Sequence, residues 1–162
     1  MDFRGFPRTF YKGNDPSFKY EWYLNNSITP GLDLNVKEAW ELGATGEGIN
    51  IAILDDGIDY LHPDLKEAYN AELSYDYSSN DPFPYPRWTK TAYNSHGTRC
   101  AGEIVSKPDN GICGVGVAPG AKVVGVRMLD QTYMTDEIEA KSMSHRFDKI
   151  DIYWKRVFVF RF

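Results

Sequence analysis

The sequence has few cysteines, fewer basic than acidic residues and no long apolar run, and each of these features excludes a class of protein. Its 162 residues contain two cysteines, Cys100 and Cys113, which are too few for a disulfide framework and lack the Cys-x-x-Cys spacing of a zinc site. The formal net charge of -5 argues against nucleic acid or an anionic membrane as the main partner. No stretch approaches the roughly 18 apolar residues that a transmembrane helix needs, and no signal peptide is visible at the start.

Enough apolar residues are present to build a core. They make up 42% of the chain, and a length of 162 residues fits one domain or part of one. Apolar runs rich in β-branched residues predict buried strands over 49–54 and 121–129. Helical spacing of apolar residues predicts a helix over 32–42, capped by Asp33 or Asn35. Strands that alternate with helices predict an α/β fold with a parallel sheet.

The first predicted strand, 49–54, runs directly into Asp55, Asp56 and Gly57. In α/β sheets, ligands and catalytic groups collect at the carboxyl ends of the strands, so the two carboxylates are candidates for a functional site. Taken alone, a strand followed by a polar turn, with both carboxylates in solvent, explains the pattern at least as well.

A second motif, His-Gly-Thr-Arg-Cys-Ala-Gly, occupies residues 96–102. Its small residues allow a helix to pack closely against a neighbour, and His96 would lie in the first turn of that helix. A lone histidine is more often a structural residue than a catalyst. The glycine-rich stretch 111–120 lacks both the Gly-x-Gly-x-x-Gly spacing and the strand–helix context of a dinucleotide site, which excludes that interpretation.

Together the two motifs resemble the subtilisin-like serine proteases, whose catalytic triad follows the chain order Asp, His, Ser. The pattern His-Gly-Thr-x-x-Ala-Gly and the segments 55–65 and 127–130 are similar to the kexin/furin branch of that family, the proprotein convertases. The resemblance covers roughly residues 14–153. It implies the first part of a peptidase S8 catalytic domain, with a truncated three-layer α/β fold and a mostly parallel sheet. An irregular segment, 1–13, and a C-terminal tail outside the family pattern, 154–162, would flank it.

The resemblance implies a calcium-dependent serine endopeptidase that cuts prohormone or proprotein precursors after paired basic residues. His96 would be the general base, and Asp55 would orient and stabilise its imidazole ring. Asp56 would face the basic substrate residue next to the cleaved one, because carboxylates select such substrates by charge. Asp76 and Asp81 fit the same electrostatic role, although a solvated loop face explains them equally well.

A calcium site is implied as well. The family pattern places Ca²⁺ among the side chains of Asp15, Asp64 and Asn110. The backbone carbonyls of Lys107, Ile112 and Gly114 would complete the site. Carboxylate, amide and carbonyl oxygens suit Ca²⁺, which takes about 6–8 oxygen ligands. A second calcium site is implied at Asp76 and Asp81, although Phe83 stands where some relatives have another carboxylate.

The sequence departs from the family pattern after residue 153. The family's serine would lie further along, and Ser142 and Ser144 have a helical context without the small neighbours of a nucleophile. Because acyl transfer needs a nucleophile, the chain by itself is expected to be inactive. The alternative is an inert, truncated convertase that acts as a binding or decoy module. By the same resemblance, Cys113 would be a free thiol and Cys100 a buried free cysteine beside the histidine.

Partners and location follow from the resemblance alone. It implies basic peptide or prohormone substrates, a convertase chaperone or propeptide as a possible further partner, and a place in the secretory pathway or a secretory granule. The tail that begins at Trp154 alternates apolar and basic residues, which predicts an exposed, aggregation-prone strand. The predicted strands would also lack later neighbours, so open sheet edges and exposed apolar surface are expected.

Overall fold

The computed structural model describes residues 11–88, 94–129 and 134–155, and these contain one 3-10 turn, three helices and four strands. In chain order the elements are η1 (Phe18–Tyr20), α1 (Val36–Glu41), β1 (Asn50–Asp55), β2 (Tyr75–Asp76), α2 (His96–Val105), β3 (Lys122–Arg127), α3 (Asp136–Met143) and β4 (Ile152–Lys155). Most of the predicted irregular segment and most of the predicted tail lie outside the described residues.

β1 lies inside a four-stranded sheet with the order β2-β3-β1-β4, in which every pairing is parallel. It pairs with β3 along its whole length and ends with Asp55 opposite Arg127. On its other side it pairs with β4, where Ile51 lies opposite Ile152. A parallel strand that is covered on both faces needs a continuous apolar run, which is what β1 has. The predicted strands and parallel sheet are therefore confirmed.

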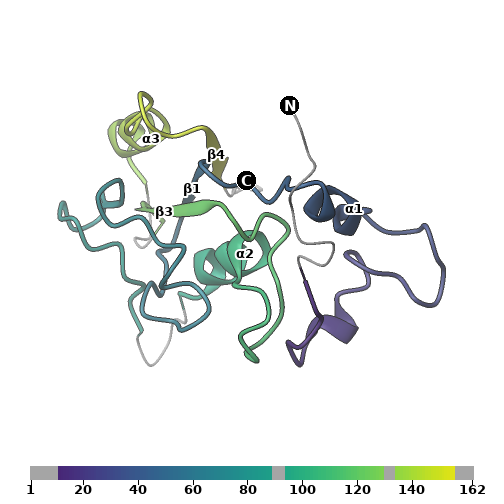
Figure 1. Cartoon of the computed structure of the whole chain (residues 1–162). Helices are drawn as coiled ribbons and strands as arrows, with labels where there is room; N and C mark the ends of the chain where they lie inside the picture. The colour runs from purple at the N-terminus through teal and green to yellow at the C-terminus, as the bar shows by residue number, and fades with distance from the viewer. Residues whose placement is uncertain (1–10, 89–93, 130–133, 156–162) are drawn as a thin grey trace, which may run out of the picture.

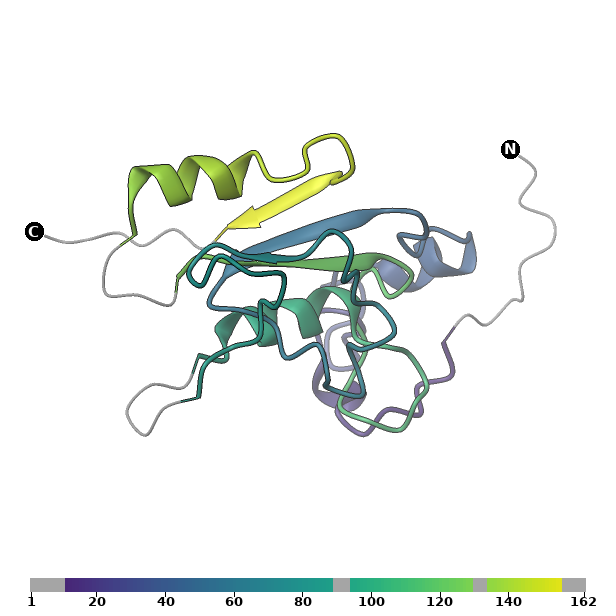
Figure 2. The same cartoon turned by 90° about the vertical axis from the view of Figure 1, so that its left-hand side faces the viewer.

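Alternate residues of the central strands face two different apolar cores. Ile51 and Ile53 of β1 pack with Val123 of β3 in the core on the α2 side. Ala52 and Leu54 belong to the core on the other face, next to α3. Figure 2 shows α2 and α3 on opposite sides of the sheet. The protein therefore has the predicted three layers: helix, sheet and helix.

A third, smaller core joins the segment before β1 to the loop after α2. Its buried members are Leu24, Trp40 and Val115. The Trp40 indole nitrogen donates a hydrogen bond of 2.9 Å to the Val117 carbonyl oxygen. Figure 1 shows η1 and α1 to one side of the strands. This packing holds the N-terminal segment against the loop that carries several of the predicted calcium ligands.

α1 is shorter than the helix predicted over 32–42, because it begins only at Val36. Asn35 has a left-handed backbone with φ 54°, and its side chain makes no capping hydrogen bond. The Asp33 carboxylate accepts hydrogen bonds from the backbone of Asn26 and Asn35. Asp33 therefore stabilises a turn before the helix, and the prediction of the longer, side-chain-capped helix is wrong.

β4 extends the sheet past the expected end of the family segment at residue 153. Trp154 and Lys155 pair with Ile53 and Leu54 of β1. No strand in the described ranges pairs with the outer edge of β4, and 50% of Ile152 and 39% of Trp154 are exposed there. The expected apolar exposure at a sheet edge is present. Among the described residues, no helix is long and apolar enough to cross a membrane.

Candidate active site

The end of β1 and the start of α2 meet on one side of the sheet. Asp55 is the last residue of β1 and is 1% exposed, and His96 is the first residue of α2. Gly97 permits the close approach: a Cβ atom added there would overlap the Gly57 carbonyl oxygen and lie 3.0 Å from Asp55 Cβ. The sequence thus brings the two predicted catalytic side chains together through a glycine in the first helical turn.

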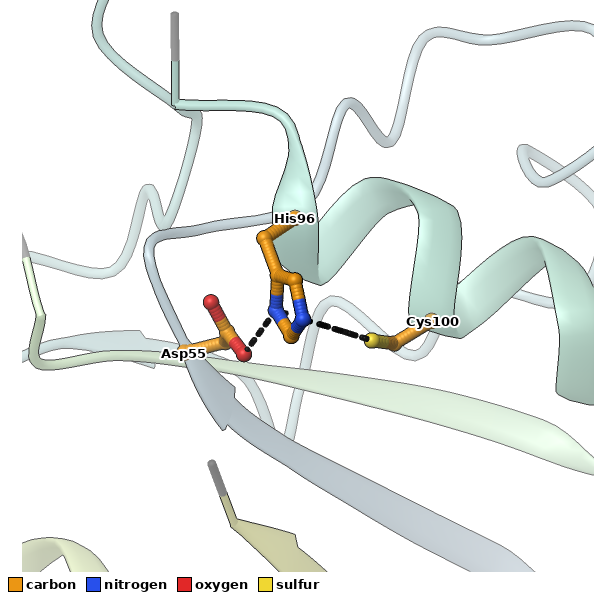
Figure 3. Close-up of side chains that lie close together, drawn as sticks. All are labelled: Asp55, His96 and Cys100. Carbon is orange, nitrogen blue, oxygen red and sulfur yellow. Dashed lines mark hydrogen bonds and ion pairs between the residues drawn. The ribbon is translucent and has the colours of Figure 1, made fainter. Parts of the chain in front are cut away.

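The side chains of Asp55 and His96 form a direct hydrogen bond (Figure 3). Asp55 Oδ2 lies 2.7 Å from His96 Nδ1, while Asp55 Oδ1 accepts a 2.7 Å bond from the Asp56 backbone. Burial raises the pKa of the Asp55 carboxyl above its ordinary value, although both hydrogen bonds act in the opposite direction. This geometry makes Nδ1 the nitrogen that carries the proton and leaves Nε2 to accept one.

Cys100 packs against the same imidazole ring from one turn further along α2. Its Sγ lies 3.6 Å from His96 Nδ1 and 3.8 Å from Nε2, and the residue is 7% exposed (Figure 3). One ligand atom from each of Asp55, His96 and Cys100 falls within 4.8 Å of the others. However, nearly equal distances place the sulfur off the in-plane direction of either ring nitrogen, so the thiol is a packing contact and not part of a metal-binding geometry. Cys100 is buried, as predicted, and forms no disulfide among the described residues.

Trp154 brings β4 into contact with the site. Its ring stacks against the His96 ring with a centroid separation of 6.2 Å and an interplanar angle of 24°. The sequence-based boundary at residue 153 left this residue out of the domain. The signal that could have found it is the run Ile152-Tyr153-Trp154, whose residue types favour strands.

Asp56 holds the start of α2. Its Oδ1 accepts a 2.8 Å bond from the Gly97 backbone and its Oδ2 a 3.1 Å bond from the His96 backbone. A carboxylate in this place satisfies two otherwise unpaired N–H groups and complements the positive end of the helix. The residue is 8% exposed. Its role toward a basic substrate residue stays a prediction, and the structure adds a positioning role that the sequence did not suggest.

Asp76 and Asp81 lie together in the loop that contains β2, because their backbones form an antiparallel bridge. The Asp76 side chain forms a buried ion pair with Arg127 and accepts hydrogen bonds from the backbone of Ser78 and Ser79. Both of its carboxylate oxygens are therefore engaged, and its charge is balanced. The second calcium site at these two residues stays a prediction, and the positively charged Arg127 side chain lies beside it.

The side chains predicted to bind calcium converge on the loop after α2. Asp15 and Asp64 are each 3% exposed. Asp15 accepts hydrogen bonds of 2.7 and 2.8 Å from the backbone of Asp109 and Gly111, and Asp64 Oδ1 lies 2.6 Å from Asn110 Nδ2. The three predicted carbonyl donors, those of Lys107, Ile112 and Gly114, belong to this same loop.

A cavity of about 340 Å³ lies beside this loop and is lined by Asp64, Cys113, Gly114 and also Glu21. Burial is the largest cause that raises the pKa of both Glu21 and Asp64, and the neighbouring Asp15 adds to it. Sequence reasoning did not place Glu21 here, because no local pattern connects it with a loop so far along the chain. Cys113 is exposed and forms no disulfide with the described residues.

Comparisons with known proteins find matches over the part of the chain that contains this site. The model of the subtilase family matches residues 46–154, which include Asp55 and His96. Neuroendocrine convertase 2 of Bos taurus is 66% identical over 144 residues and that of Caenorhabditis elegans 62%; each alignment covers 86% of this chain, and 23% and 22% of those proteins. The chain thus spans about a quarter of the length of these curated relatives.

A solved structure has the same arrangement of elements. The serine protease of Aeromonas sobria matches with a TM-score of 0.71 and 29% identity, over 94% of this chain and 26% of that one. Within the convertases, the segments 30–36 and 81–87 resemble prohormone convertase 2, and the similarity to neuroendocrine convertase 2 confirms that resemblance. The chain has an aspartate at a strand end and a histidine at the start of a following helix, and the family model matches more than half of its sequence. The chain therefore belongs to the subtilase family of serine proteases.

Proposed function

We propose that this chain carries the Asp–His part of a serine endopeptidase active site of the proprotein convertase type. The 2.7 Å contact between Asp55 Oδ2 and His96 Nδ1 supports this proposal most directly. In such a site, His96 Nε2 takes the proton from a serine hydroxyl as the oxygen attacks the peptide carbonyl, and later gives it to the leaving amine. Asp55 fixes the ring orientation and stabilises the imidazolium that forms between the two steps.

The nucleophile is the component that the described residues do not supply. Among them, no serine hydroxyl forms a hydrogen bond with the His96 ring. Ser142 and Ser144 donate their hydroxyls to the Ile138 and Ala140 carbonyls within α3, at 2.7 and 2.8 Å. We therefore expect the 162-residue chain on its own to lack acyl-transfer activity.

An inert binding or decoy module is the second candidate. The observation that favours it is the Trp154 ring, which lies nearly parallel to the His96 ring with the centroids 6.2 Å apart. Such a module would retain affinity for basic peptides, a propeptide or a chaperone without cleaving them. One structural neighbour is the Aeromonas sobria serine protease in a complex with a chaperone, at a TM-score of 0.70 and 30% identity.

The proposed substrates are prohormone or proprotein precursors cut after paired basic residues. The net charge of -5 and the carboxylates of Asp56 and Asp81 are compatible with a basic peptide, whereas the charge of Asp76 is balanced by Arg127. Asp56 lies nearest to the catalytic pair, since it contacts the His96 backbone. Secretion or storage in secretory granules is proposed from the similarity to neuroendocrine convertases.

A calcium ion is proposed at the loop after α2, held by the side chains of Asp15, Asp64 and Asn110 and by the carbonyls of Lys107, Ile112 and Gly114. Two observations support the fit. The donors are all oxygen atoms, which Ca²⁺ prefers. Both carboxylates are buried, Asp64 lines the cavity, and neither forms an ion pair in the described ranges. The ion would supply a structural cross-link between the N-terminal segment and the loop.

The test is a chimera in which residues 14–153 replace the equivalent segment of a full-length neuroendocrine convertase 2. We expect it to hydrolyse a fluorogenic peptide with two consecutive arginines, and His96→Ala or Asp55→Asn to lower kcat by about 10⁴-fold. The exposed Asp136→Asn serves as the control, which should leave kcat unchanged. Hydrolysis by the isolated 162-residue chain, abolished by His96→Ala, would show that this chain is complete as an enzyme. A folded but inactive chimera would refute the catalytic proposal and leave the binding module.

A further inference from the structure

Asn25 begins the one N-glycosylation sequon of the sequence, Asn25-Asn26-Ser27. No other asparagine is followed two positions later by serine or threonine. Asn25 is exposed, and it lies between η1 and α1, outside any helix or strand. Because a glycan is bulky and belongs on the surface of a protein, an exposed loop is a suitable place for its attachment.

The side chain of Asn25 leaves the acceptor atom available. Its Oδ1 accepts a hydrogen bond of 3.2 Å from Lys37 Nζ, and its Nδ2, the atom that takes the sugar, donates to no atom of the described residues. The neighbouring Asn26 differs, because its Nδ2 donates a hydrogen bond of 3.0 Å to the Leu32 carbonyl. Modification of Asn25 would therefore break no hydrogen bond within the described part of the chain, since the amide oxygen that contacts Lys37 remains.

The loop that follows the acceptor, residues 26–34, holds apolar side chains in solvent. Ile28 is 93% exposed, and Leu32 and Leu34 are exposed as well. The Asn26 side chain fixes the shape of this loop, because its Oδ1 accepts hydrogen bonds from two backbone N–H groups while its Nδ2 donates to a third residue. The loop therefore presents its apolar side chains in a defined conformation that does not fold them inward.

Trp22 adds an exposed aromatic ring three residues before Asn25. The Leu34 backbone donates a hydrogen bond of 2.8 Å to the Tyr23 carbonyl, so the end of the loop lies beside the segment that carries this ring. Exposed apolar side chains gathered in one place mark a surface that something else covers or that favours association. A glycan suits this surface, because the C–H face of a sugar ring packs against apolar side chains while its hydroxyl groups stay in water.

We propose that Asn25 is an N-glycosylation site and that its glycan covers the apolar surface formed by Trp22 and the loop 26–34. This inference rests on the secretory location proposed above. The Asn25 amide nitrogen attacks the anomeric carbon of an oligosaccharide carried on a polyprenyl diphosphate. An N–C bond forms, the C–O bond to the diphosphate breaks, and the amide gives up one proton. In Figure 1 the segment between η1 and α1 lies at the outer right, away from the sheet, so a glycan there would leave the Asp55–His96 pair accessible.

The test directs the 162-residue chain into the secretory pathway of cultured animal cells with a cleavable secretion signal. Cell extract and medium are both treated with peptide-N-glycosidase in ¹⁸O-labelled water, and mass spectrometry then identifies the modified asparagine. We expect a single glycan, at Asn25, and a band shift on electrophoresis that the glycosidase reverses. Asn25→Gln and Ser27→Ala should abolish the shift, whereas Ser27→Thr should retain it. Asn26→Gln is the matched control, because it changes the neighbouring amide, keeps the sequon and should keep the glycan.

Binding of the apolar dye 8-anilinonaphthalene-1-sulfonate tests whether the glycan covers the loop. Ser27→Ala lacks the glycan and retains every apolar side chain, so its dye fluorescence should exceed that of the glycosylated wild type. Adding Leu32→Gln and Leu34→Gln to Ser27→Ala should remove most of that increase, because both side chains belong to the exposed loop.

The outcomes separate this inference from the proposed peptidase function. An unmodified Asn25 in the secretion-directed chain, in extract and medium alike, would overturn the site. A glycan at Asn25 together with equal dye fluorescence in the wild type and Ser27→Ala would overturn the covering role. Catalysis is tested by the chimera described above, which also contains Asn25. An inactive chimera that is glycosylated at Asn25 would refute the catalytic proposal and support the glycosylation site.

Discussion

Replacement of Gly97 by alanine adds one methyl group at the point where α2 meets the end of β1. A Cβ atom there would overlap the Gly57 carbonyl oxygen and lie 3.0 Å from Asp55 Cβ and 3.1 Å from Asp56 Oδ1. None of these neighbours is the mobile end of a long side chain, so the helix must move away from the strand. The displacement acts on the Asp55–His96 contact, because His96 is the adjacent residue.

Gly102, on the same helix, provides a matched control. A Cβ atom at that position would lie 3.4 Å from Ser106 Oγ, which is an ordinary van der Waals contact. Gly102→Ala should therefore stabilise the chain by about 0.5–1 kcal/mol through helix propensity. Gly97→Ala gains at most the same amount but adds overpacking, which costs about 1–3 kcal/mol. The difference between the two variants isolates the overpacking.

Urea unfolding of the two variants, followed by circular dichroism, measures that difference. In the chimera described above, Gly97→Ala should also lower kcat by up to about a hundredfold, since an error of 1 Å in position has that effect. Gly102→Ala should leave kcat unchanged. If Gly97→Ala is as stable as Gly102→Ala, the contact between helix and strand is looser than the structure indicates and the reasoning is refuted.

Three further predictions concern single side chains. Asp56→Ala removes the acceptor for two backbone N–H groups at the start of α2 and should lower the free energy of unfolding by about 1–2 kcal/mol in urea, whereas Asp56→Asn should recover part of the loss. Burial raises the pKa of Tyr69 to about 12. Its contribution to stability is therefore complete below the ordinary tyrosine pKa of about 10 and falls as the pH rises toward 12, and Tyr69→Phe should reduce the alkaline loss seen in pH-dependent unfolding. Trp154→Ser should increase the rate at which diethyl pyrocarbonate modifies His96, measured by mass spectrometry, because the nearby ring hinders approach of the reagent; an unchanged rate would contradict that arrangement.

The proposed catalytic pair of Asp55 and His96 could be picked out from the sequence because each member is marked by a local pattern. Asp55 ends an apolar strand and His96 begins a helix of small residues, and both patterns are visible within about ten residues of sequence. The fold class followed from the same strands and helices. The order Asp before His then identified the family without any knowledge of distances.

The contacts that sequence reasoning missed join distant segments. Glu21 meets Val115, 94 positions later, and no local pattern at either residue indicates this hydrogen bond. Asp56 was assigned to substrate by resemblance, while its two hydrogen bonds to α2 depend on how the helix docks. Trp154 lay beyond the expected end of the domain, and only its pairing with Ile53 shows that it belongs to the sheet.

The all-parallel sheet also has a consequence for synthesis on the ribosome. Ile51 of β1 is paired with Ile152 of β4, so about a hundred residues separate the two strands along the chain. At about 5–20 residues per second, β1 emerges roughly 5–20 s before β4 exists. Throughout that interval, the apolar residues of β1 lack one partner strand and remain able to pair with other chains. The time between the synthesis of these two strands, more than the stability of the finished sheet, sets how long the nascent chain needs protection from aggregation.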